Sequence, residues 1–190
     1  MTPVVSLVVA LLIWFFPLWI FHAKNARLGS FDQRAWPRGR NLVLGLFDLA
    51  RAWVGGDLLV RSIGAFPDFG FGSSWDGAMG LAVVFGVALA VHAFAWCNED
   101  YLFAPVGFVF GSLVALIEPQ VLIIGLPLGI GAALAIRAWS AGFIGAGVGL
   151  AGVGLALADD WRRSLLVGVV LTLPVLLSVL AGRHLGAPRK

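Results

Sequence analysis

Long runs of apolar residues, separated by short polar connections, follow one another along almost the whole chain. A membrane-spanning helix needs about 20 mostly apolar residues, and these runs have about that length. The strict alternation of a membrane β-barrel is absent, so the pattern predicts helices. The expected spans are residues 4–22, 41–63, 77–96, 101–117, 121–137, 141–157 and 165–181.

Composition supports the same class of protein. Of the 190 residues, 60% are apolar and only 12% are charged, which is outside the range of soluble domains. Six or seven crossings use up this length and leave no separate soluble domain. The sequence therefore predicts an all-α integral membrane protein, with residues 1–190 forming a single compact bundle of six to seven transmembrane helices.

The first apolar run, residues 4–22, has no positive charge before it, unlike a secretory signal peptide. The loop that follows carries five basic residues against a single acid, Asp32; they are Lys24, Arg27, Arg34, Arg38 and Arg40. The positive-inside rule makes this loop cytoplasmic and the N-terminus external. Abundant Ala, Gly, Leu and Arg with almost no Lys indicate a bacterial inner (plasma) membrane.

The run at residues 41–63 differs from the others because it contains two acid/base pairs. Asp48 and Arg51 are three residues apart, and Asp57 and Arg61 are four apart, which are the spacings of helical ion pairs. Each ionisable group costs roughly 2.5–3.5 kcal/mol at the centre of a membrane helix, so such groups mark a site or an interface. Together with Asn41, these four residues form the candidate headgroup or ion-pair site.

Whether residues 41–63 cross the membrane decides the topology. With seven spans, basic residues in loops divide nine inside to two outside; with this segment lying flat, they divide seven to four. The charge bias favours a crossing, and the four charges oppose it. A charged helix that faces the bundle interior and is broken at Gly55-Gly56 reconciles both signals.

The two pairs have a structural and a functional interpretation. As structure, they neutralise each other and fix the rotation of the helix. As function, Arg51 and Arg61 hold the phosphate or carboxylate of a lipid headgroup, with Asp48 or Asp57 as the base. Basic loop residues would then attract anionic membrane lipids.

A second polar cluster, His92, Asn98, Glu99 and Asp100, could complement the first. His92 and Glu99 are two helical turns apart and share a face if the helix continues. The ordinary alternative is a packing histidine followed by a solvated turn. With a single cysteine, Cys97, the chain has no internal disulfide or thiolate site, and we expect no metal and no cofactor.

Small residues recur at every fourth position in three of the runs, which predicts close helix packing. These stripes are Gly107, Gly111 and Ala115; Gly125, Gly129 and Ala133; and Ala141, Gly145 and Gly149.

No motif names a reaction: the chain has no P-loop, zinc helix, nucleophile elbow or CxxC pair. No basic and aromatic face indicates a nucleic-acid partner. Three hypotheses remain, and whether the protein is an enzyme stays open among them. The first is a non-catalytic subunit or scaffold, bound to other membrane subunits or to copies of itself. The second is an enzyme acting on a lipid or lipid-linked headgroup at the cytoplasmic face. The third is a small-solute or ion transporter.

Overall fold

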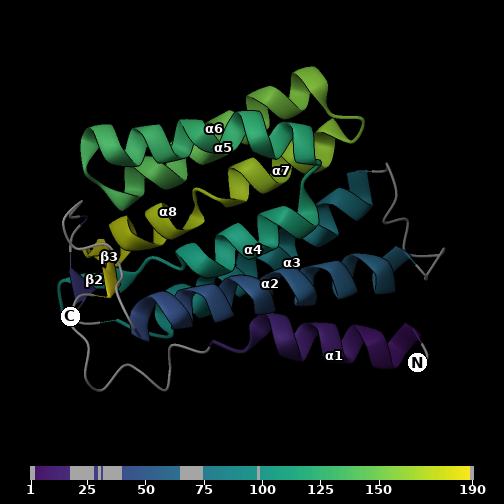
Figure 1. Cartoon of the computed structure of the whole chain (residues 1–190), viewed down its shortest axis with the longest axis horizontal. Coiled ribbons are helices and arrows are strands. Elements are labelled where there is room, and N and C mark those ends of the chain that lie inside the picture. Colours follow the sequence, from purple (N-terminus) through teal and green to yellow (C-terminus); the bar gives the residue numbers. More distant parts are fainter. Residues whose placement is uncertain are drawn as a thin grey trace.

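A computed structural model describes residues 3–17, 28–29, 31, 40–64, 75–97 and 99–188. Its helices run side by side along the long axis, and the connections between them lie at the two ends (Figure 1). The helices are α1 Pro3–Phe15, α2 Arg40–Gly64, α3 Trp75–Phe94, α4 Val106–Leu116, α5 Pro119–Ile136, α6 Trp139–Leu157, α7 Trp161–Val170 and α8 Leu173–Leu180.

Four helical segments among the described residues are long and apolar enough to cross a membrane: α3, α5, α6 and the α7–α8 pair. Helices α1 and α4 are apolar but shorter. Large apolar side chains cover the outside, such as Ile123 at 72% exposure and Val148 at 65%. Such a surface suits lipid as its solvent. The predicted class, a helical membrane protein, is confirmed, with four rather than six or seven candidate spans meeting these criteria.

The first predicted span, residues 4–22, is longer than the helix. Helix α1 ends at Phe15, Phe16 and Pro17 follow in non-helical backbone, and residues 18–22 lie outside the described part. Pro17 has no N–H to continue the helix and disfavours a helical Phe16. The proline therefore accounts for the early end of α1.

The predicted break at Gly55-Gly56 is wrong, because α2 is helical without interruption from Arg40 to Gly64. The two glycines allow neighbouring helices to approach instead. A Cβ on Gly55 would lie 3.1 Å from Cγ2 of Ile13, and one on Gly56 would lie 2.8 Å from Cβ of Ala115.

Of the five later predicted spans, three match helices to within two residues: α3, α5 and α6. The span predicted at 101–117 begins too early, because strand β2, Tyr101–Phe103, precedes an 11-residue α4. The span predicted at 165–181 is two helices, α7 and α8, separated by Leu171 and Thr172. Pro174 in the first turn of α8 cannot donate the hydrogen bond that would continue α7.

A small sheet, which the sequence did not predict, lies at one end of the helical bundle. Its strands are β1 Leu28–Gly29, β2 and β3 His184–Pro188, in the order β1-β3-β2. Strand β3 is antiparallel to β1 and parallel to β2, and the sheet lies near the C-terminus (Figure 1). Leu28, Trp96 and Phe103 form a separate hydrophobic cluster at this sheet. The segment that follows the last helix thus forms a strand, β3.

The helices pack in a row, with α5 against α6, α6 against α7, and α7 and α8 against α3. Helix α2 packs against α1 and α4 (Figure 1). The small-residue stripes lie at these contacts, as predicted: a Cβ on Gly107 would lie 2.7 Å from the carbonyl oxygen of Gly45, and one on Gly125 would lie 2.9 Å from that of Gly149.

Candidate functional site

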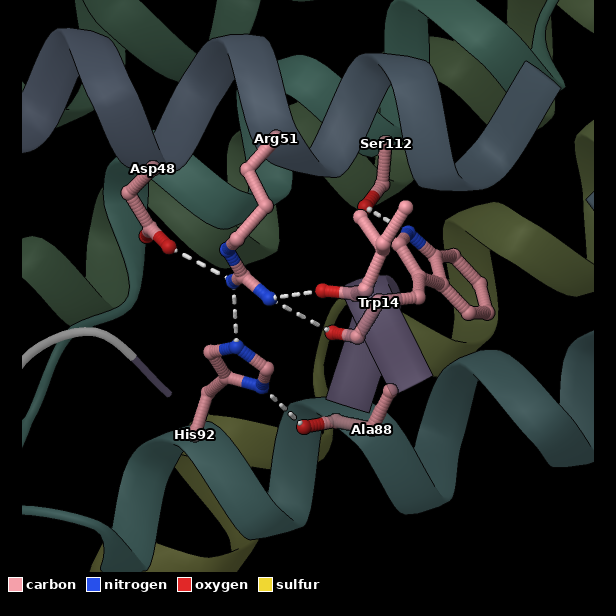
Figure 2. Close-up of polar contacts among 7 residues, drawn as sticks. Trp14, Asp48, Arg51, Ala88, His92 and Ser112 are labelled. Atoms are coloured by element: carbon pink, nitrogen blue, oxygen red, sulfur yellow. Dashed lines mark hydrogen bonds and ion pairs between the residues drawn. The ribbon is translucent and has the colours of Figure 1, made fainter. Parts of the chain in front are cut away.

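The innermost charged pair of the described residues lies on α2, whose helical spacing turns Asp48 and Arg51 toward the bundle interior (Figure 2). The Asp48 side chain is fully buried and that of Arg51 is 11% exposed. Nη2 of Arg51 donates to Oδ1 of Asp48 at 2.6 Å. The predicted ion pair therefore forms, and it forms inside the protein.

Arg51 also binds the end of α1. Its Nη1 donates to the carbonyl oxygens of Ile13 and, at 3.1 Å, of Trp14 (Figure 2). The last carbonyls of a helix have no intrahelical donor, and lipid supplies none. The oxygen of Ile13 is the one to which residue 17 would donate in a longer helix, and residue 17 is proline. Arg51 replaces that donor, and its positive charge meets the negative end of the α1 dipole.

His92 joins the same group of atoms from α3. Its Nε2 lies 2.7 Å from Nη2 of Arg51, and its Nδ1 lies 2.8 Å from the carbonyl oxygen of Ala88 (Figure 2). A guanidinium only donates, so Nε2 must accept, and the proton on Nδ1 is donated to Ala88. These contacts define a neutral imidazole in one tautomer. The ring stacks on Phe108 of α4, with centroids 4.0 Å apart.

We call Asp48, Arg51, His92 and the carbonyls of Ile13 and Trp14 the polar junction. One negative, one positive and one neutral side chain give it no net charge. Trp14 extends it to α4 by donating from Nε1 to Oγ of Ser112 at 3.0 Å. The junction therefore ties together α1, α2, α3 and α4.

The donors of Arg51 are almost all in use. A guanidinium has five N–H groups, and four of them contact Ile13, Trp14, Asp48 and His92. A bidentate contact with a phosphate or carboxylate needs two free N–H groups. Such a ligand would have to displace at least one of these four contacts.

The structure separates the second charged pair from the junction. Asp57 and Arg61 form an ion pair of 2.9 Å, as their spacing predicts, but their side chains are 43% and 75% exposed. They lie near the C-terminal end of α2. Asn41 lies in the first turn of α2, and its side chain is outside the described part. The five predicted residues therefore do not form one site.

The second predicted cluster also divides. Helix α3 ends at Phe94, so the helix does not continue to Glu99, and the condition for a shared face with His92 is not met. Glu99 and Asp100 are exposed in the connection to β2, and Asn98 lies outside the described residues. His92 is the member that contacts the first cluster, through Arg51. No three His, Cys, Asp or Glu side chains in the described ranges could hold a metal ion together.

Sequence reasoning missed the α1 contribution to the junction. The signal was Pro17 inside the first predicted span, because a proline leaves the carbonyl four residues earlier without its donor. In a membrane, that carbonyl needs another partner. Nothing in the spacing of the sequence indicated that Arg51 would donate to this carbonyl, or that His92 would contact Arg51.

The end of the bundle opposite the sheet also has polar contacts. Asp160 caps α7 by accepting from the N–H of Arg163 at 3.3 Å, and their side chains form an ion pair of 2.9 Å. Glu118 accepts from the N–H of Asp160 at 3.1 Å and so joins the α4–α5 turn to the α6–α7 turn. The guanidinium carbon of Arg162 lies 5.0 Å from the ring centre of Trp161. These contacts suit helix ends at the headgroup level.

The geometry of the polar junction is the basis for a functional proposal, since no family model, curated protein or solved structure matches this chain.

Proposed function

We propose that the protein is a non-catalytic subunit or scaffold of a larger complex in a bacterial inner membrane. The observation that carries this proposal concerns Arg51, the interior side chain best suited to bind a ligand. Its guanidinium forms hydrogen bonds with four groups of the same chain. A buried guanidinium with nearly all its donors occupied stabilises helix positions. It is poorly suited to binding and releasing a substrate.

The periphery of the bundle supports the same proposal. Helix α5 packs mainly against α6, and of the four candidate spans it is the least buried, at 22%. Ile123, Ile124 and Leu128 on α5 are all more than half exposed. An outer helix with this much apolar surface gives neighbouring subunits, or further copies of the chain, room to pack in the membrane.

The sheet supports a seven-crossing topology. Strands β1 and β2 both pair with β3, so residues 28–29, 101–103 and 184–188 lie at the same end of the bundle. Only α2 and α3 lie between β1 and β2 in the described sequence. If α2 lay flat, α3 alone would cross and would carry β2 to the other side. We therefore propose that α2 crosses, that the sheet is cytoplasmic, and that the N-terminus is outside.

Cys97 tests this topology because its side chain is exposed at the sheet end of the bundle. An impermeant maleimide should label Cys97 only after the cells are permeabilised. A cysteine introduced at Asp159, in the exposed turn at the other end, is the matched control and should react in intact cells. The opposite result, rapid labelling of Cys97 in intact cells, would overturn the topology.

The scaffold proposal is tested by native mass spectrometry of the intact particle in a mild detergent. We expect either other polypeptides in a fixed ratio or a defined homo-oligomer. A monomer without bound polypeptide in several detergents would contradict the proposal. Arg61→Ala, which alters an exposed pair, should leave the subunit ratio unchanged.

A second candidate function, an enzyme acting on a lipid headgroup, has one favourable observation. Arg61 is 75% exposed near the end of α2, where a lipid phosphate can approach its guanidinium. In the seven-crossing topology this end of α2 faces outside, so the headgroup would belong to the outer leaflet. This candidate predicts that an anionic phospholipid co-purifies with the protein and is lost on Arg61→Ala but not on Arg163→Ala.

A further inference from the structure

We propose that the polar junction holds a bound water molecule between Asp48 and Arg51, beside the first turn of α4. The proposal concerns the interior of the bundle and does not depend on the scaffold function. It rests on two buried polar atoms, on the charges around them, and on the closure of the site.

Two polar atoms of the junction have no hydrogen-bond partner in the described part of the chain: Oδ2 of Asp48 and Nε of Arg51. A carboxylate and a guanidinium can form two parallel hydrogen bonds, but this pair forms one, between Nη2 and Oδ1. One acceptor and one donor are left over in the same cluster. Buried polar groups in native proteins are nearly always paired with protein or with ordered water.

The first turn of α4 adds backbone donors. The opening N–H groups of a helix have no acceptor within the helix, and α4 has no side-chain cap, although the N–H of Val106 is paired with the carbonyl oxygen of Ala104 at 2.8 Å. A Cβ on Gly107 in this turn would lie 3.4 Å from Oδ2 of Asp48. The unpartnered carboxylate oxygen is therefore next to the positive end of a helix.

The surrounding charges select a neutral ligand. The carboxylate of Asp48 repels an anion, and Arg51 together with the α4 N-terminus repels a cation. The ligand must donate to Oδ2 of Asp48 and accept from Nε–H of Arg51. Water does both, and a polar site with several partners is where buried water is found.

The hydroxyl group of a lipid alcohol could also donate to Asp48 and accept from Arg51. The site is closed to lipid, however, which identifies the ligand as water. The side chain of Asp48 is 0% exposed and that of Arg51 is 11% exposed. The glycerol of a lipid cannot enter such a site while its acyl chains remain outside the bundle.

The test is water-edited solid-state NMR on protein labelled with ¹⁵N-arginine in lipid bilayers. The Arg51 Nε–H signal, identified by its loss in Arg51→Lys, should gain magnetisation from water within the short mixing times typical of bound water. Arg61, exposed on the same helix, is the matched positive control. The proposal would be overturned if the Arg51 signal is resolved but receives no magnetisation from water at mixing times at which the transfer to Arg61 is complete.

Asp48→Leu supplies a second arm by removing the acceptor that holds the water. We expect the transfer from water to Arg51 Nε–H to fall several-fold, while transfer to Arg61 is unchanged. Undiminished transfer in a folded Asp48→Leu protein would overturn the bridging position. If this variant does not fold, the wild-type measurement still decides whether the site contains a water molecule.

Discussion

Arg51 donates a hydrogen bond to the carbonyl oxygen of Ile13, the oxygen that Pro17 leaves without its helical donor. A side chain of α2 thus supplies the hydrogen-bond donor that the end of α1 lacks. Because the same guanidinium also contacts Asp48 and His92, the termination of α1 and its packing with α2 and α3 depend on a single residue.

Arg51→Ala should lower the free energy of unfolding by about 3–5 kcal/mol, because it leaves the Asp48 carboxylate buried without its countercharge. Arg61→Ala is the matched control, and the loss of that exposed pair should cost no more than about 1 kcal/mol. Denaturant unfolding in mixed micelles measures both. Equal, small effects for the two variants would show that the junction does not stabilise the fold.

Pro17→Ala should reduce the cost of losing Arg51. An alanine at position 17 has an N–H that can donate to the oxygen of Ile13, so this carbonyl no longer depends on the guanidinium. In a double-mutant cycle with Arg51→Gln, we expect a coupling energy of about 0.5–3 kcal/mol in the direction of rescue. Additive effects would refute the link between Pro17 and Arg51.

His92→Leu should destabilise the protein by about 1–3 kcal/mol, because one N–H of Arg51 loses its acceptor inside the bundle. His92→Gln retains a side-chain acceptor and should cost less. Thermal unfolding of the two purified variants makes the comparison. If the two variants lose the same stability, the packing on Phe108 matters and the hydrogen bond does not.

Gly111→Ala and Gly131→Ala test the close packing of α2 and α4. A Cβ on Gly111 would lie 2.9 Å from Cβ of Ala52 and still nearer the backbone of Leu49, whereas one on Gly131 would meet nothing within 4 Å. We expect Gly111→Ala to cost about 1–3 kcal/mol through overpacking. Gly131→Ala should be neutral or mildly stabilising. The result to look for in unfolding experiments is this difference in sign between two identical substitutions.

Truncation after Arg183 removes the middle strand, β3, and should leave β2 without a strand to pair with. The N–H of Ala104 donates to the carbonyl oxygen of Gly186 at 2.8 Å, and the truncation removes that acceptor. Hydrogen exchange at Ala104 should accelerate at least tenfold, since its protection depends on this bond. Truncation after Pro188 keeps the strand and should leave the exchange rate unchanged; acceleration in both would mean that the effect does not come from β3.

The sequence predicted best what depends on local periodicity. Helices α3, α5 and α6 follow from apolar length alone, and the pairing of Asp48 with Arg51 follows from their spacing on one helix. The contact between Arg51 and His92 joins residues 41 positions apart, and no local pattern records it. The strands escaped prediction because β1 has only two residues and β2 three, too few for an alternating pattern.

The order of the strands has a consequence for the timing of assembly. The middle strand, β3, is the most C-terminal of the three, and His184 follows Gly29 by 155 residues. At about 5–20 residues per second of synthesis, β1 waits roughly 8–30 s for the strand it pairs with. The helices can enter the membrane in sequence during this interval, but the sheet end of the bundle closes only after β3 has been synthesised. Closure of this sheet is therefore a late event that any chain lacking β3 would never reach.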